Sequence, residues 1–174
     1  MIAQIQGKLV EKNPTDLVID CNGVGYEIKI TLNTFTSLSD NEAIKVYTQL
    51  IVREDAQILY GFQTKEEREM FNLLISVSGI GPNTAMIMLS SLTPSEIAHA
   101  IQSENVTLIQ SVKGIGAKTA QRVIVDLKGK SMIVESDLKE NGLRKIFMRL
   151  EKKCRLNFQL LKFKWCSQAI QEMN

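Results

Sequence analysis

Residues 77–85 read Val-Ser-Gly-Ile-Gly-Pro-Asn-Thr-Ala, and residues 112–120 repeat the pattern as Val-Lys-Gly-Ile-Gly-Ala-Lys-Thr-Ala. The copies begin 35 residues apart, and each lies between two stretches with the apolar periodicity of a helix. A helix, a Gly-Ile-Gly turn and a second helix make up the helix-hairpin-helix pattern. The sequence therefore predicts two such units in tandem within an all-helical region, residues 64–130.

The Gly-Ile-Gly turns predict two sites for phosphate. Glycine accepts positive φ and has no Cβ to obstruct a ligand, so we expect both glycines of each pair to use this freedom. The backbone N–H groups of the turn and of the next helix's first turn then point outward, where the helix dipole adds to their attraction for an anion. Such contacts hold phosphate without reading base sequence. The four glycines are Gly79, Gly81, Gly114 and Gly116.

Polar side chains next to the turns predict a stronger second site. Lys118 adds a charge-assisted contact where the first copy has Asn83, and Arg122 adds a second cation. Thr84 and Thr119 occupy matching positions, where a hydroxyl caps the helix or reaches a phosphate oxygen. Residues 105–130 carry a net charge of +4. We therefore expect the first copy to depend more on its backbone donors.

Three alternatives compete with this interpretation. In a generic interaction module, the Gly-Ile-Gly turns only connect packed helices. A nucleotide site of the Walker A type is rejected, because Ala117 separates Gly116 from Lys118 and no strand leads into the motif. A helix-hairpin-helix glycosylase or nuclease needs a placed carboxylate, and Asp126 is the only acid that closely follows the second copy.

The first third of the chain reads as a small β-barrel. Five short β-rich runs are separated by turn residues, a spacing that favours an antiparallel barrel of the OB type over a βαβ fold. The fold class is therefore α+β multidomain, with residues 1–63 as the barrel. Thr64 then predicts a helix N-cap, with Glu67 completing a capping box. The five runs are residues 2–10, 17–21, 25–30, 43–52 and 57–62.

Several motifs in order resemble the RuvA family, the Holliday-junction-binding subunits of branch-migration complexes. They are Met1-Ile2, Asn-Gly-Val-Gly-Tyr-Glu at 22–27, Val-Arg-Glu-Asp-Ala at 52–56, Leu-Tyr-Gly-Phe at 59–62 and both Gly-Ile-Gly copies. The resemblance implies a non-catalytic homotetramer that holds four-way junction DNA open. It also implies two protein partners, a RuvB-type hexameric ATPase and a junction resolvase, with ATP turnover belonging to the motor.

Glu54 and Asp55 lie between two predicted strands, so we expect them at the tip of a β-hairpin. The residues alone favour a solvated acidic turn. The resemblance implies instead an acidic pin, four copies of which repel phosphates at the crossover and discriminate against linear duplex. Arg53 beside them either pairs with a phosphate or braces the two acids.

The composition of the chain excludes several further classes of protein and of site. The net charge is only +2, which excludes a protein that binds nucleic acid through a uniformly basic surface. The charge is unevenly distributed, with −3 for residues 1–63, +1 for 64–130 and +4 for 131–174. Three scattered cysteines argue against a disulfide framework or zinc site and fit a reducing cytoplasm. The uncharged stretch 72–92 contains Gly, Pro and Ser residues, so we reject a transmembrane helix, and we see no signal peptide. We expect no catalytic residue, metal or cofactor.

The end of the chain departs from the family pattern. Residues 131–141 are expected to be a linker, and 142–174 form a basic and aromatic segment in place of the expected motor-binding domain. This divergent segment includes one amphipathic helical pattern that fits DNA, an anionic membrane or a partner helix. The alternative is a terminus that folds poorly, which places motor binding by this chain in doubt.

Overall fold

The computed structural model describes residues 1–38 and 43–128. All of these residues belong to one compact unit. The predictions for the linker at 131–141 and for the segment 142–174 lie outside the described residues.

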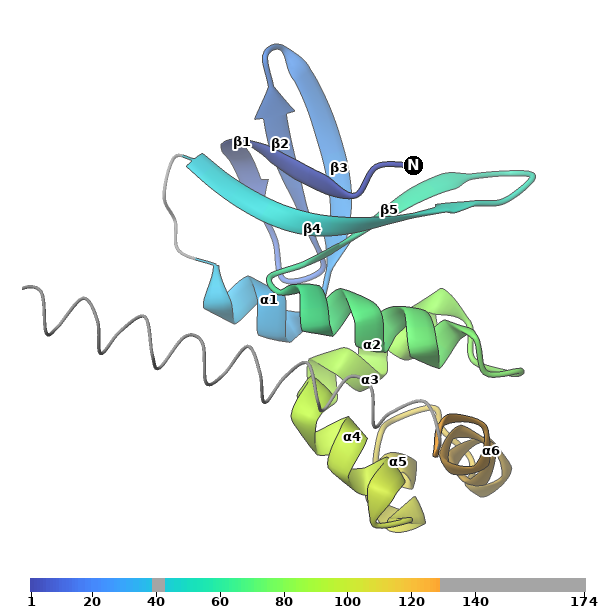
Figure 1. The fold of residues 1–174 in the computed structure, drawn as a ribbon. Coiled ribbons are helices and arrows are strands. Elements are labelled where there is room, and N and C mark those ends of the chain that lie inside the picture. The colour runs from blue at the N-terminus through green and yellow to red at the C-terminus, as the bar shows by residue number, and fades with distance from the viewer. Residues whose placement is uncertain (39–42, 129–174) are drawn as a thin grey trace, which may run out of the picture. The chain divides into compact units, whose positions relative to one another are not determined.

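The N-terminal region is a closed five-stranded barrel (Figure 1). The strand order around the barrel is β1-β2-β3-β5-β4, with every neighbouring pair antiparallel except β3 and β5. The predicted OB-like barrel and its five strands are thus confirmed. The strands are β1 (Gln4–Lys12), β2 (Asp16–Cys21), β3 (Val24–Ile30), β4 (Ala43–Val52) and β5 (Gln57–Phe62).

Alternating side chains fill the barrel. Leu17 and Ile19 of β2 are fully buried, while Val18 between them is half-buried on the outer side. This period of two is what a strand imposes, because successive side chains point to opposite faces. The core also contains Ile5, Ile28, Ile30, Leu38, Ile44 and Val46.

A short helix, α1 (Leu32–Ser37), follows β3 and was not predicted from the sequence. Its N-cap is Thr31, whose hydroxyl accepts from the backbone N–H of Thr34. The Asn33 amide donates to the Leu89 carbonyl over 2.6 Å, so α1 connects the barrel to the helices that follow.

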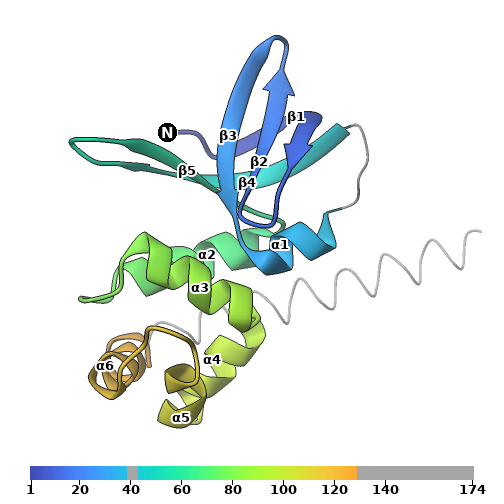
Figure 2. The same cartoon turned by 180° about the vertical axis from the view of Figure 1, so that it is seen from behind.

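Five helices form the rest of the described chain, as predicted for residues 64–130 (Figures 1 and 2). Thr93 and Glu96 form a complete capping box, with Pro94 at the first helical position. The helices are α2 (Lys65–Ile75), α3 (Pro82–Ser91), α4 (Pro94–Gln102), α5 (Val106–Gln110) and α6 (Ala117–Leu127).

The capping box predicted at Thr64 and Glu67 is only half formed. The Thr64 hydroxyl accepts from the Glu67 N–H, but the Glu67 carboxylate turns away from the N-cap. It accepts from the Thr31 and Thr34 hydroxyls at 2.5 and 2.9 Å, and from the Gln63 N–H at 3.2 Å. Glu67 is only 5% exposed, and burial raises the pKa of its carboxyl although these hydrogen bonds oppose the shift. A buried polar connection thus joins α2 to α1.

Aromatic side chains complete the contact between barrel and helices. Tyr60 and Phe62 point outward from β5 and are buried against Phe71 of α2, with ring centroids 5.2 and 5.0 Å apart. Since α2 leads directly to residues 77–85, this packing fixes the first Gly-Ile-Gly turn relative to the barrel.

Candidate nucleic-acid interface

The first Gly-Ile-Gly turn joins α2 to α3. Gly79 has φ +95°, a left-handed conformation that only glycine adopts at low cost. Gly81 has φ −88° and ψ 168°, so it is extended backbone and serves as the N-cap of α3. Ile80 between them is 5% exposed, and its N–H donates to the Val77 carbonyl over 3.1 Å.

The second turn, between α5 and α6, has the same geometry. Gly114 has φ +89°, and Gly116 is the N-cap of α6 with φ −82° and ψ 162°. Ile115 is 6% exposed and donates to the Val112 carbonyl over 3.2 Å. The expectation that both glycines use positive φ is wrong, because only the first glycine of each pair reverses the chain.

Both turns are open at their surface. All four glycines are exposed, and a Cβ added at Gly81, Gly114 or Gly116 would meet no atom within 4 Å. The glycine N-caps supply no side chain to the first turn of α3 or α6. The amides there are consequently left without partners among the described residues, as expected at a helix N-terminus. Each turn therefore has the open donors and the positive dipole end that bind an anion.

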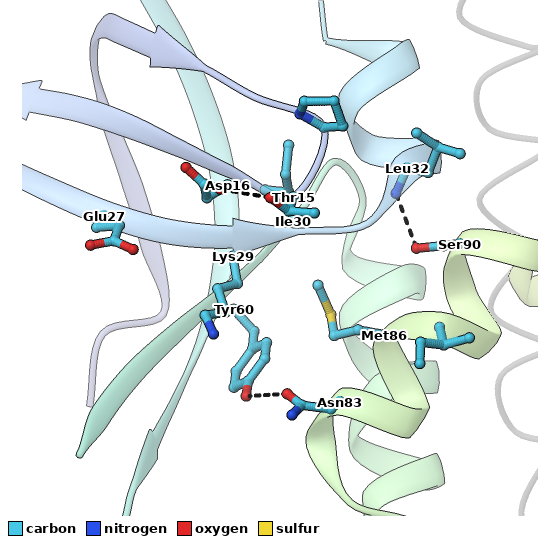
Figure 3. Close-up of a pocket in the computed structure, with 12 residues that line it drawn as sticks. Thr15, Asp16, Glu27, Lys29, Ile30, Leu32, Tyr60, Asn83, Met86 and Ser90 are labelled. Atoms are coloured by element: carbon cyan, nitrogen blue, oxygen red, sulfur yellow. Dashed lines mark hydrogen bonds between the residues drawn. The ribbon is translucent and has the colours of Figure 1, made fainter. Parts of the chain in front are cut away.

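The first turns of α3 and α6 differ in chemistry. Pro82 occupies the first helical position of α3 and has no N–H, whereas Ala117 of α6 does. Asn83 accepts from the Tyr60 hydroxyl over a long 3.5 Å (Figure 3). Lys118, in contrast, is exposed and makes no ion pair with a described residue. The first site thus has fewer donors than the second.

Thr84 and Thr119 both lie at the third position of their helices and are half-buried. Neither is an N-cap, because that position belongs to the preceding glycine. Of the two roles predicted for these hydroxyls, capping is wrong. Their contact with a phosphate oxygen stays a prediction.

Arg122 connects the two hairpins. Its Nη1 donates to the Ser78 carbonyl over 3.1 Å and lies 3.5 Å from the Ser78 hydroxyl oxygen. A Cβ at Gly79 would lie 3.7 Å from the same nitrogen. A side chain of α6 thereby touches the turn that precedes α3 and holds the two Gly-Ile-Gly turns near each other. Motif spacing gave no sign of this contact, which joins residues 44 positions apart.

Glu54 and Asp55 lie at the tip of the β4–β5 hairpin, as predicted. The strands pair as far as Val52 and Gln57, and the Arg53 N–H donates to the Ala56 carbonyl over 2.8 Å. Both acids are exposed, and the hairpin extends beyond the other strands (Figure 1). Within the described chain, Arg53 makes no ion pair with either acid, so this structure lacks the bracing contact.

Comparison with known proteins gives the same two regions. Residues 1–61 match the model described as RuvA N terminal domain, and residues 71–129 match the SAM-like helix-hairpin-helix tandem. A protein from Christiangramia forsetii is 61% identical over 137 residues, which are 79% of this chain and 71% of the relative. One from Flavobacterium psychrophilum is 60% identical over 130 residues, covering 75% of this chain and 67% of the relative.

A third relative, from Neisseria meningitidis, is 51% identical over 131 residues, covering 75% of this chain and 68% of its own length. All three carry the name Holliday junction branch migration complex subunit RuvA. This chain belongs to the RuvA family. The resemblance inferred from the sequence motifs is therefore confirmed, and it covers the barrel and both hairpins of this RuvA-family chain.

Residues 1–38 and 43–128 contain no group of three His, Cys, Asp or Glu side chains placed to hold a metal ion. No helix in the same residues is long and apolar enough to cross a membrane.

Proposed function

We propose that this RuvA-family chain is a non-catalytic subunit that binds four-way (Holliday) junction DNA and presents it to a RuvB-type hexameric ATPase. Branch migration in recombination and repair would be the outcome. The name shared by the relatives, branch migration complex subunit, supports this proposal. Residues 1–63 serve as the barrel and 64–130 as the tandem DNA-binding domain, followed by the linker at 131–141.

The observation that carries the proposal is the pair of matching Gly-Ile-Gly turns. Each is open at its surface and precedes a helix whose first amides lack partners in the described structure. A phosphate placed over either turn receives N–H donors and the positive end of a helix dipole. Two such sites linked by Arg122 fit neighbouring phosphates of one DNA arm, with no requirement for base sequence.

Discrimination between junction and duplex is assigned to the exposed Glu54 and Asp55. In a homotetramer, four hairpin tips would meet near the crossover and repel phosphates there. Continuous duplex would be disfavoured at that point, while separated strands would pass around the tips. The extension of the β4–β5 hairpin beyond the barrel supports this placement (Figure 1).

The protein partners are a RuvB-type hexameric ATPase and a junction resolvase. ATP turnover belongs to the motor, and the chain itself acts in the cytoplasm as its DNA-binding partner. Contact with the motor is assigned by the family pattern to residues 142–174, which lie outside the described residues and diverge from that pattern in sequence.

A gel-shift comparison tests this function. The chain is expected to bind a four-way junction more tightly than linear duplex or single strands of the same sequence. Glu54→Gln combined with Asp55→Asn should reduce the preference for junction over duplex, because the repulsive charge is removed. Identical competition curves for both proteins would count against the pin. Cleavage of junction or damaged DNA in the presence of magnesium would overturn the non-catalytic assignment.

A further inference from the structure

A cleft lies between the barrel and the first helix-hairpin-helix unit. It has a volume of about 690 Å³, with residues of β2 and β3 in one wall and residues of α3 in the other (Figure 3). Tyr60 of β5 and Asn83 of α3 line the cleft where α3 begins. Gly81, the N-cap of α3, directly precedes this first turn of the helix. This end of the cleft therefore borders the proposed phosphate site of the first hairpin.

Tyr60 connects the barrel to the first turn of α3. Its ring is buried against Phe71, and its hydroxyl donates to the Oδ1 atom of Asn83 over 3.5 Å. Burial raises the pKa of the Tyr60 hydroxyl, although the positive charge of Arg53 opposes that rise. The hydroxyl is therefore a neutral hydrogen-bond donor at physiological pH.

The hydrogen bond from Tyr60 determines how the Asn83 amide is oriented. Because Oδ1 accepts this bond, the Nδ2 atom faces away from Tyr60, and it donates to no residue that the structure describes. Asn83 is exposed, so both N–H groups of Nδ2 are open to a ligand. An amide donor at the second position of α3 adds to the positive end of the helix dipole, and both attract an anion.

Lys29 brings a positive charge to the same cleft. It pairs with Tyr60 in the parallel ladder of β3 and β5, and it points outward because Ile28 and Ile30 on either side of it are buried. The Lys29 and Tyr60 side chains extend from the two strands toward α3 (Figure 3). Lys29 is exposed and forms no ion pair with a described residue. Its ammonium group is thus available to an anion.

The two acids that line the cleft do not neutralise Lys29. Asp16 lies opposite Lys29 on β2, but its carboxylate accepts from the Thr15 hydroxyl over 2.7 Å and from the Asn13 amide over 3.1 Å. These hydrogen bonds lower the pKa of the Asp16 carboxyl more than the charge of Lys29 does. Glu27 lies two residues earlier on β3, on the side of Lys29 away from α3 (Figure 3). Among the described residues, Lys29 therefore keeps an unpaired charge.

We propose that Lys29 and the Asn83 amide extend the first phosphate site, so that the DNA strand lying over the first Gly-Ile-Gly turn also contacts the barrel. The second hairpin carries Lys118 on its own helix, whereas the first takes its cation from β3. A DNA strand suits this arrangement because it presents phosphates in a row to contacts that come from two elements. The inference rests on the proposed function and names further residues of the same site. Tyr60 is a positioning residue that acts through Asn83.

Removing the charge of Lys29 tests the barrel contact. Lys29→Gln is expected to weaken junction binding about fivefold and to lower the slope of log K against log salt by about 0.9, because one phosphate contact is lost. Both quantities come from anisotropy titrations of labelled four-way junction DNA at several salt concentrations. Lys45→Gln is the matched control, because Lys45 is an exposed lysine of β4 that loses the same charge, and it should leave the slope unchanged.

A double-mutant cycle tests the positioning role of Tyr60. Tyr60→Phe keeps the ring that packs against Phe71 and removes the hydroxyl. It should weaken junction binding about threefold without changing the salt slope, because a neutral hydrogen bond is lost and no charge is removed. In an Asn83→Ala background the same substitution should have no further effect. An equal loss in both backgrounds would show that Tyr60 does not act through Asn83.

Other outcomes overturn the inference. A Lys29→Gln variant whose affinity and salt slope change no more than those of Lys45→Gln would exclude Lys29 from the DNA contact. A lower mass of the Lys29→Gln variant in light scattering would assign Lys29 to the association of copies instead. If the wild type binds the junction and the Lys29 variant binds equally well, the inference alone fails. A wild type that binds no junction would refute the proposed function and this inference with it.

Discussion

The two Gly-Ile-Gly hairpins share one backbone but differ in what they present to a ligand. Gly79 and Gly114 have φ of +95° and +89°, and the isoleucine that follows each is buried to the same extent. The first turn of α3 contains Pro82 and Asn83, whereas that of α6 contains an alanine and Lys118. The first hairpin therefore lacks one N–H and one positive charge that the second has.

This difference separates two features on which the proposed phosphate binding depends. The glycine pattern sets the shape of the turn in both copies, whatever residues follow. We propose that the first helical turn sets the strength of each site, because a single proline or lysine there changes the number of donors. The surroundings differ as well, because Asn83 lies against Tyr60 of the barrel and Lys118 is exposed.

Exchanging the residues at the matching positions 83 and 118 should have the largest effect on junction binding. Lys118→Gln is expected to weaken junction binding by about tenfold or more, because a charge-assisted hydrogen bond contributes about 1.5–3 kcal/mol. The loss should be equal for all DNA sequences, and the slope of log K against log salt should fall by about 0.9. Fluorescence anisotropy at several salt concentrations measures both quantities.

Asn83→Lys is the reciprocal change and should steepen the same slope. If Asn83→Lys strengthens binding while Lys118→Gln weakens it, the charge at this position decides the strength of each hairpin. An unchanged slope in both variants would contradict the comparison.

Replacing each glycine of the second turn by alanine should separate the effect of backbone conformation on stability from the effect of a side chain on the approach of DNA. Gly114→Ala forces a side chain into a left-handed conformation and should lower the free energy of unfolding by about 1–2 kcal/mol. Gly116→Ala keeps an ordinary φ in open space but replaces the N-cap glycine of α6 by a poorer N-cap residue, so it should lower stability less than Gly114→Ala does. Its methyl group would stand between the turn and bound DNA. We expect several-fold weaker junction binding for both variants. Urea unfolding with anisotropy distinguishes them, and equal stability losses would refute the different roles of the two glycines.

Removing the Arg122 side chain that connects the two hairpins should have a smaller effect on junction affinity. Arg122→Gln is expected to lower junction affinity a few-fold and to flatten the salt dependence, but by less than Lys118→Gln. The reason is that one Nη of Arg122 already donates to the Ser78 carbonyl. Arg122→Lys is the control that keeps the charge and loses the planar fork. A salt slope unchanged after the joint substitution of Lys118 and Arg122 by Gln would contradict their assignment to phosphate.

The smallest expected effect concerns Glu67, which positions the first hairpin through α2. Burial raises the pKa of this carboxyl, so its contribution to stability is fully present below the ordinary glutamate pKa and is lost as pH rises through the raised pKa. Glu67→Gln should remove that part of the pH dependence, since an amide does not ionise. Urea unfolding of both proteins from about pH 4 to pH 8 measures the difference. Parallel stability curves would show that Glu67 does not titrate in this range.

Local patterns predicted most of this fold. The strand runs had clear β composition and turn residues between them, and the repeated Gly-Ile-Gly pattern identified both hairpins. Helix α1 was missed because its six residues are too few to show helical periodicity. The role of Gly81 and Gly116 was misread because the motif alone does not say which glycine reverses the chain and which caps the helix.

Long-range contacts were beyond local patterns. Glu67 matched a capping box in sequence, but its partners Thr31 and Thr34 are more than 30 residues away. The contact between Arg122 and Ser78 likewise depends on how two helix pairs pack. The tip position of Glu54 and Asp55 was predictable from the flanking strands, but their role as a pin came only from the family resemblance and stays a prediction.

The most direct test of the phosphate sites is a titration of isotope-labelled protein with four-way junction DNA, followed by backbone amide NMR. Downfield shifts of the amide signals are expected at Gly81 and Thr84 in the first hairpin and at Gly116, Lys118 and Thr119 in the second. The shifts in the second hairpin should be the larger ones. Amides of both hairpins that stay unshifted when the junction is saturating would contradict the account.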